Sequence, residues 1–574
     1  MRAAWCRANN ETGRMNSPSP KTRANAFLPL WYAFAAFLCL GYIVLPFFYT
    51  LRSATFVDGA FTLSVFQEFF GNPNHVQVAL NSLKLGVGTV LVCGTLGTVL
   101  ALYMTFLAGK HKMILHILLL SPMMIPGVIT VIAFIQLYGE SGLVTKALQM
   151  LLNLSSAPFT FKGFGAILFV IAYTQYVYFY LNVYVALKYL DYSQIEAARS
   201  LGASWGRVFK DVILPVIKPA LLLSTILTFA SGVSSFSGPN LIGGYKVLST
   251  QIVLSKVNNH LEMASVQAVV MFAISISVML LVRWYGRKTS GVQADRVATR
   301  VVPLRANPLL VLGARVVVIA QIVLILLPIA AIVYLSFMTT GSIMQEIFPH
   351  SFTLENYQTI FAKPRVLQPL LNSLEMSALA VVIGLLITVP SAYIIVRNRT
   401  KLSGVMRFLI MLPSALPASL IAINLINAFA QENIFAFNVP LIGSYIILPI
   451  AYTVMALPML LSSNEVAIGS LHHTMEEASK SLGAGPLRTF VSVVIPNTVP
   501  GILAGGVLMF IRMIGEYTMS ALLYGIHNRP ISISIVTNLQ EYETGISLAY
   551  GVLVILVCYV ALALIFKLDK NRFV

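Results

Sequence analysis

The stretch "EAARSLGASWGRVFKDVILP" at residues 196–215 carries five charged side chains in a chain that is otherwise strongly apolar. A near copy, "EASKSLGAGPLRTFVSVVIP", occurs at residues 477–496. Over the aligned segments 196–219 and 477–500, 11 of 24 positions are identical. Two such copies indicate an internal duplication, and the organisation of the rest of the chain follows from them.

The composition is that of a membrane protein. The 574 residues are 57% hydrophobic and only 10% charged, and the mean hydropathy is +0.83. A water-soluble protein could not cover its surface with so few charges, and apolar runs of 18 or more residues recur. We therefore predict an all-α, polytopic membrane protein with about twelve spans. The predicted spans are 27–50, 81–105, 113–138, 164–187, 218–236, 264–284, 309–337, 372–396, 405–430, 440–461, 500–524 and 546–566.

The basic residues are distributed unequally between the two predicted sides. Of the 38 Lys and Arg residues, 27 fall in the tails and loops of one side and 8 in the loops of the other. The positive side of a membrane protein is cytoplasmic, so both termini and both copies of the opening stretch are predicted to be cytoplasmic. Topology explains much of the net charge of +18, and we expect no nucleic-acid partner.

Other segments repeat as well. "FTLSVFQEFFGNP" at 61–73 matches "FTLENYQTIFAKP" at 352–364, at an offset of 291 residues, whereas the opening stretch repeats at an offset of 281. Each half has six predicted spans, an even number, so the halves form a parallel repeat. The predicted divisions are a cytoplasmic tail (1–26), a first half (27–285, core 81–285), a cytoplasmic linker (286–308) and a second half (309–574, core 372–566).

Both copies contain a pattern that predicts a helix start. "SQIE" at 193–196 has the form of a capping box, in which Ser193 caps a helix and Glu196 reaches back to the cap amide. "TMEE" at 474–477 gives the same roles to Thr474 and Glu477.

The same copies also contain signals for helix ends. Gly202 and Gly483 stand where a left-handed residue is expected after a short helix. A second helix follows each glycine, and Pro215 and Pro496 are predicted to end it before the next span. One interpretation is an amphipathic helix on the bilayer. The matched positions and the helix–glycine–helix order favour a paired docking site for a two-fold symmetric partner.

These residues carry a resemblance to a known family. Glu-Ala-Ala, Gly and a final Leu-Pro at fixed spacing are similar to the signature of permease subunits of ATP-binding-cassette (ABC) importers. The second copy departs from it by Ser479 for the second Ala and Ile495 for Leu. In that family the loop is the coupling helix that docks in a groove of the ATPase, within the type I importer permease fold. The residues that the resemblance assigns to coupling are Glu196, Ala197, Ala198, Gly202, Glu477, Ala478, Ser479 and Gly483.

The resemblance also implies partners. No GxxxxGK[ST] motif occurs in the chain, so ATP and Mg would be bound by a separate ATPase subunit, present in two copies. A periplasmic binding protein would deliver the solute to this bacterial inner-membrane subunit, which contacts membrane lipid. The chain itself is expected to be a transport subunit rather than an enzyme, with no cofactor of its own.

The fused halves resemble the ferric-iron permeases most, and the 2-aminoethylphosphonate, thiamine and polyamine importers are alternatives. A secondary transporter is a rival of another class, because it would explain the spans but not the paired loops. A membrane-embedded enzyme is a further rival, but it would need a cluster of His, Asp or Cys at one depth, which the sequence lacks.

Polar residues at membrane depth are candidates for the translocation path. Glu516 is the clearest, and Arg512 one turn earlier could neutralise it by an i,i+4 ion pair. Ser235 is the equivalent of Glu516 in the first half. No residue pattern predicts a metal site: the four cysteines form no CxxC motif, and His472 and His473 are adjacent on the cytoplasmic side.

Overall fold

The computed structural model describes residues 27–57, 59–108, 112–287, 308–346, 350–398 and 400–568. The predicted tail 1–26 and nearly all of the predicted linker 286–308 lie outside the described residues. Apart from turns and loops, the described part is helical except for one short hairpin and one bridge. Strand β1 (Phe56–Val57) pairs antiparallel with β2 (Ala60–Phe61), and Met338 bridges to Phe352.

The first half begins with a helix that contains one π turn: α1 (Phe27–Cys39), η1 (Leu40–Val44) and α2 (Leu45–Thr55). The elements that follow in this half are α3 (Ser64–Gly71), α4 (Pro73–Phe106), α5 (Lys112–Leu120), η2 (Ser121–Met124), α6 (Gly127–Tyr138), α7 (Leu143–Leu151), α8 (Gly163–Leu187), α9 (Tyr192–Ser200), α10 (Trp205–Val208), η3 (Phe209–Ile213), α11 (Leu214–Val233), α12 (Ser237–Ile242), α13 (Leu248–Val257) and α14 (Leu261–Arg287).

The second half begins with the long helix α15 (Pro308–Ser336). Its other elements are α16 (Thr340–Gln345), α17 (Glu355–Ala362), α18 (Pro364–Arg397), α19 (Lys401–Met411), η4 (Leu412–Ala415), α20 (Ala418–Phe429), η5 (Ile434–Ala436), α21 (Ile447–Gly469), α22 (His473–Ser481), α23 (Pro486–Thr489), η6 (Phe490–Val494), α24 (Ile495–Ile514), α25 (Thr518–Leu523), α26 (Ile531–Gln540) and α27 (Thr544–Leu568).

The core helices of the two halves repeat each other in the same order. Helices α4 and α18 have the same length of 34 residues and start 291 residues apart, and α9 and α22 have the same length of 9 residues and start 281 apart. Helix α7 accounts for the longer loop of the first half. In the described residues, 11 helices are long and apolar enough to cross a membrane, and the bent pair α19–α20 would make a twelfth span. The all-α fold with about twelve spans is thus confirmed.

Two predicted spans are not continuous helices. Segment 113–138 breaks before Pro126, and 405–430 breaks before Pro417, where the two helical parts are bent by 109°. The residue before each proline is extended: Ile125 has φ −93° and ψ 125°, and Leu416 has φ −94° and ψ 125°. A proline disfavours helical geometry at the preceding residue, and that preference breaks both spans at the same place.

Pro215 and Pro496 do not end their helices, contrary to the sequence prediction. Helices α10 and α11 run together from Trp205 to Val233 through the π turn η3, and α23 and α24 are joined in the same way by η6. Each proline follows directly after a π turn, a local irregularity by which a continuous helix can accommodate a residue that lacks the N–H donor. Each loop therefore continues without a break into a membrane helix.

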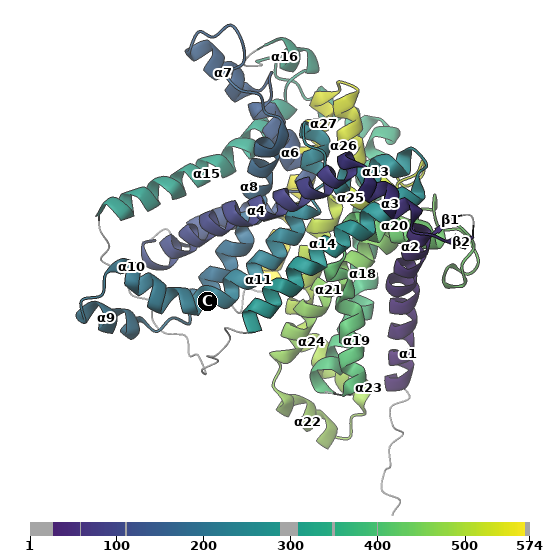
Figure 1. Cartoon of the computed structure of the whole chain (residues 1–574). Helices are drawn as coiled ribbons and strands as arrows, with labels where there is room; N and C mark the ends of the chain where they lie inside the picture. The colour runs from purple at the N-terminus through teal and green to yellow at the C-terminus, as the bar shows by residue number, and fades with distance from the viewer. Residues whose placement is uncertain are drawn as a thin grey trace, which may run out of the picture.

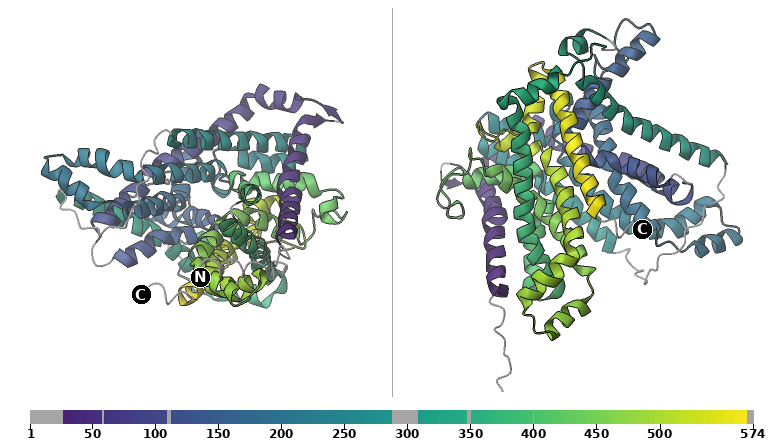
Figure 2. Two further views of the ribbon diagram at one scale, coloured as in Figure 1. Left: turned by 90° about the horizontal axis from the view of Figure 1, so that it is seen from below. Right: turned by 180° about the vertical axis from the view of Figure 1, so that it is seen from behind.

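The first helix of each half packs on the core of the other half. Helices α1 and α2 lie against α18, α19 and α20, whereas α15 lies against α4, α5 and α6, as the two views in Figure 2 show for α1 and α15. Polar contacts join the halves: the Asn427 amide donates to Thr50 Oγ1 at 3.1 Å, and the Tyr173 hydroxyl donates to the Ile325 carbonyl at 3.2 Å. The two halves are therefore interlocked, and hydrogen bonds between membrane helices contribute to their association.

Candidate functional site

The two repeated loops both lie away from helices α7 and α16. Figure 1 shows α22–α23 at its lower end, where α1 also starts, α9–α10 at its lower left, and α7 and α16 at the top. Each loop is a helical hairpin, in which a short helix is followed by a turn and a second helix that continues into the membrane. The duplication therefore produces a matched pair of protruding elements.

In the first loop the helix starts earlier than the capping-box prediction placed it. Asp191 is the N-cap, and its Oδ1 accepts from the Ser193 backbone N at 3.0 Å and from the Ser193 hydroxyl at 2.8 Å. Ser193 is therefore the second helical residue, and its predicted role as the cap is wrong. Aspartate is as good a cap as serine, and here its side chain accepts the hydrogen bond from the Ser193 backbone amide. Glu196 is exposed on the helix.

The second loop also departs from the capping-box prediction. Helix α22 follows His472, whose side chain makes no cap hydrogen bond, and Thr474 is again the second helical residue. Glu477 lies 3.1 Å from His473 Nδ1 rather than near a cap amide. The prediction of Thr474 as the cap is wrong, because α22 already begins at His473, directly after the turn that ends α21. The side chain of Glu476 holds the helix in this position.

The turns after the two short helices have the predicted left-handed glycine. Gly202 has φ +81° and Gly483 has φ +83°. In the first loop Gly202 N donates to the Arg199 carbonyl at 2.9 Å and Ala203 N to the Ala198 carbonyl at 3.0 Å. This is the Schellman pattern, and the second loop repeats it through Gly483 and the residue after it, at 2.9 and 3.1 Å. Both hairpins therefore have the same turn.

The tip of each hairpin exposes a leucine. Leu201 is 88% exposed and Leu482, its equivalent, is 89% exposed. Beside them lies a face of small and acidic residues, of which Ala198 and Ser479 are half-buried between the hairpin helices. The exposed members of this face are Glu196, Ala197, Glu477 and Ala478. The sequence interpretation missed the two leucines, although each directly precedes the left-handed glycine.

At the far end of the membrane helices, Glu516 does not pair with Arg512. Helix α24 ends at Ile514 and the chain turns at Gly515, so the i,i+4 geometry is lost. Arg512 is exposed, while the Glu516 carboxylate is buried and accepts from Met519 N at 2.9 Å and Ser520 N at 3.1 Å. The predicted ion pair is wrong, because these backbone amides supply the hydrogen bonds to the carboxylate instead.

Ser235 occupies the place in the first half that Glu516 occupies in the second. The Ser249 hydroxyl donates to the Ser235 carbonyl at 2.5 Å, and the Ser532 hydroxyl donates to the Glu516 carbonyl at 2.7 Å. The backbones are thus held alike while the side chains differ. Among the described residues, no group of three or more His, Cys, Asp or Glu side chains is arranged to hold a metal ion.

The comparison with protein families decides what these two halves are. The model of the binding-protein-dependent transport system inner membrane component matches residues 94–291 and again residues 380–573. The chain belongs to this family. It is a multi-pass permease subunit of an ABC importer, with both permease units fused in one chain.

Individual relatives agree with this assignment. A probable ABC transporter permease protein of Sinorhizobium fredii is 30% identical over 94% of this chain and 95% of its own. A ferric transport system permease protein of Actinobacillus pleuropneumoniae is 26% identical over 90% of this chain and 76% of its own. A spermidine/putrescine transport system permease protein of Haemophilus influenzae is 30% identical over 35% of this chain and 73% of its own.

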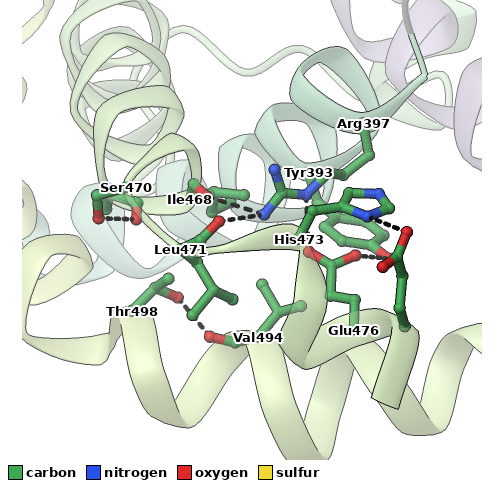
Figure 3. A network of polar contacts seen from close by, with 11 residues as sticks. Tyr393, Arg397, Ile468, Ser470, Leu471, His473, Glu476, Val494 and Thr498 are labelled. Atoms are coloured by element: carbon green, nitrogen blue, oxygen red, sulfur yellow. Dashed lines mark hydrogen bonds and ion pairs between the residues drawn. The ribbon is translucent and has the colours of Figure 1, made fainter. Parts of the chain in front are cut away.

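The sequence interpretation missed a buried charged contact at the second hairpin of this ABC permease. Glu476, next to the predicted Glu477, is only 1% exposed, and the Arg397 guanidinium donates to its carboxylate at 2.7 Å (Figure 3). The partners are 79 residues apart in sequence, so no local pattern connects them. A signal was nevertheless present, because a second acidic residue stands where the first half has an isoleucine.

Proposed function

We propose that this chain is the permease of a ferric-iron importer of the bacterial inner membrane. Two copies of a separate ATPase subunit, which bind and hydrolyse ATP with Mg, dock on the α9–α10 and α22–α23 hairpins. A periplasmic binding protein delivers ferric iron at the opposite end, where α7 and α16 lie, and both termini are cytoplasmic. The observation that carries this proposal is the pair of matched hairpins. Both lie away from α7 and α16, in a chain whose two halves each match the permease family.

The helices provide a mechanical route from each hairpin to the interface between the halves. Residues 205–233 are continuously helical and lead directly to Ser235, and residues 486–514 lead in the same way to Glu516. At 1.5 Å per residue such a helix is roughly 40 Å long. When ATP draws the two ATPase subunits together, the hairpins move with them, and these helices carry the displacement to the interface.

Transport then follows from alternating access between two states of the halves. ATP binding must favour the outward-open state over the resting state, because a ligand shifts an equilibrium only by its differential affinity for the two states. The exposed leucines suit the docking of the ATPase, since each buries apolar area when a partner covers it.

Ferric iron is the proposed substrate because the ferric permease relative aligns over nearly the whole fused chain. A polyamine is the second candidate, since the spermidine/putrescine relative has a higher identity over a shorter segment. The aminoethylphosphonate and thiamine importers remain alternatives from the resemblance of the fused halves.

The experiment is ATP hydrolysis by the chain co-purified with its ATPase and reconstituted in nanodiscs. We expect stimulation by the binding protein loaded with ferric iron and none by the same protein without iron. Stimulation by a binding protein loaded with spermidine, thiamine or 2-aminoethylphosphonate, but not by the iron-loaded one, would contradict the ferric assignment. It would leave the importer assignment intact.

A further inference from the structure

The second hairpin is fixed to the membrane helices by a buried ion pair. Arg397 Nε donates to Glu476 Oε1 at 2.7 Å, and the Tyr393 hydroxyl donates to Glu476 Oε2 at 3.2 Å. Glu476 is 1% exposed and the Arg397 side chain 14%. Because both groups are largely withdrawn from water, each depends on the other for compensation of its charge.

Arg397 connects three segments at this point. Besides Glu476 of α22, its Nη2 donates to the carbonyls of Ile468 at 3.3 Å and Leu471 at 3.0 Å, at the end of α21. Arg397 itself is the last residue of α18. Figure 3 shows the guanidinium between these carbonyls and the Glu476 carboxylate. The planar guanidinium with several fixed donors suits this geometry, so the orientation of α22 is tied to the ends of α18 and α21.

The first hairpin has no such pair at the equivalent positions. Phe106 stands 291 residues before Arg397, and Ile195 stands 281 residues before Glu476. Both are buried, at 5% and 1% exposed, and both belong to the apolar core of the first half. The two hairpins have the same backbone form, but one is held by non-directional apolar packing and the other by directional, charged hydrogen bonds.

We propose that Arg397 and Glu476 are positioning residues for coupling, which make the second hairpin the more rigid of two inequivalent links between ATPase and permease. The inference rests on the proposed function. A displacement of α22 is passed to α18 and α21 through the ion pair, whereas the first hairpin slides against its apolar contact. When either charge is lost, the ATPase still binds, but part of its movement is no longer passed to α18 and α21.

The test measures ATP hydrolysed per solute imported in proteoliposomes, for wild type and for Glu476→Gln. Breaking one coupling element typically changes coupling by about 2- to 30-fold, and we expect this ratio to rise within that range while the ATPase still co-purifies. The matched control is Glu465→Gln, which breaks the Arg407–Glu465 pair of the same half, where Arg407 Nε lies 2.9 Å from the carboxylate and the Arg407 side chain is 55% exposed. The control should keep the wild-type ratio.

Two double variants keep the inference testable if Glu476→Gln does not accumulate. Glu476→Arg with Arg397→Glu retains the ion pair in reverse but loses the hydrogen bonds from residue 397 to the Ile468 and Leu471 carbonyls, so it should recover only part of the coupling. Glu476→Ile with Arg397→Phe copies the first half, and we expect it to fold but to keep the raised ratio. A wild-type ratio in the apolar double variant, or a Glu476→Gln ratio equal to that of the control, would overturn the inference. If wild type itself shows no ATP-dependent import, the proposed function fails instead.

Discussion

Phe236 and Tyr517 occupy equivalent positions in the two halves and lie against each other, with ring centroids 5.1 Å apart. They directly follow Ser235 and Glu516. Residues related by a two-fold axis can touch each other only near that axis, so the pseudo-two-fold axis of the molecule passes beside these rings. The Asn240 amide donates to the Tyr517 hydroxyl at 2.9 Å and strengthens the contact between the halves. On the proposed function, a translocation path along this axis would be closed by these rings.

This closure predicts the effect of removing both rings. Phe236→Ala with Tyr517→Ala should destabilise the closed state, since an aromatic pair contributes about 0.5–1.5 kcal/mol beyond its buried area. Basal ATP hydrolysis without binding protein should then rise about 2- to 12-fold. Phe48→Ala, at an exposed position of α2, serves as the control. An unchanged basal rate together with a normal stimulated rate would show that the rings do not act as a gate.

The exposed leucines predict where the ATPase binds most strongly. Leu201→Ala and Leu482→Ala should each weaken binding of the ATPase by about 1.5–3 kcal/mol, the value of burying one leucine side chain. Affinity of the detergent-solubilised chain for the ATPase, measured by titration, checks this. Leu151→Ala, at an 80% exposed position of α7 at the opposite end, should leave the affinity unchanged. Equal affinities for all three variants would contradict docking at the hairpin tips.

The glycine turns predict a purely backbone effect. No atom lies within 4 Å of a Cβ added at Gly202 or Gly483, so only the positive φ opposes alanine, at a cost of about 1–2 kcal/mol per site. Amide hydrogen exchange in the hairpins of Gly202→Ala/Gly483→Ala should therefore become about 5- to 30-fold faster.

The matched control for this change is Gly206→Ala, which also has open space around the added Cβ but lies in helix α10 without a positive φ. Alanine favours the helix there, so exchange should stay the same or become slower. Faster exchange in the control than in the double variant would refute the backbone explanation.

Much of this architecture could be predicted from sequence because it depends on short-range signals. The apolar spans and the left-handed glycines are encoded by residues close together in sequence, the repeat is read by aligning two such segments, and Gly202 and Gly483 have the expected conformation. The capping predictions for Ser193 and Thr474 failed because Asp191 caps earlier in one copy, and His472 leaves the other without a side-chain cap.

The remaining differences come from contacts between distant segments. Arg397 and Glu476 meet only after α18 and α21 have packed side by side, and Phe236 meets Tyr517 only across the interface between the halves. The prediction of an Arg512–Glu516 ion pair failed for a local reason. Helix α24 ends at Ile514 and the chain turns before Glu516. Periodicity does not reveal such a turn within an apolar run.

The separation of Arg512 from Glu516 can be tested by a double-mutant cycle on thermal stability in detergent. Glu516→Ala should lower the free energy of unfolding by about 1–3 kcal/mol, because buried backbone amides lose their acceptor. Arg512→Ala should change little, and the interaction energy of the two should be about zero, within about 0.5 kcal/mol. A larger favourable coupling would mean that Arg512 and Glu516 form an ion pair and would contradict their separation.

ATP-dependent uptake of ferric iron in proteoliposomes tests the central claim most directly, with the chain, its ATPase and the iron-loaded binding protein present. We expect uptake only with ATP and the ATPase. Uptake should fall about tenfold or more in Glu196→Arg/Glu477→Arg, because reversed charges in a docking surface cost several kcal/mol. Uptake that proceeds without the ATPase, or that is as fast in the double variant as in wild type, would contradict the claim that the paired hairpins couple ATP hydrolysis to transport.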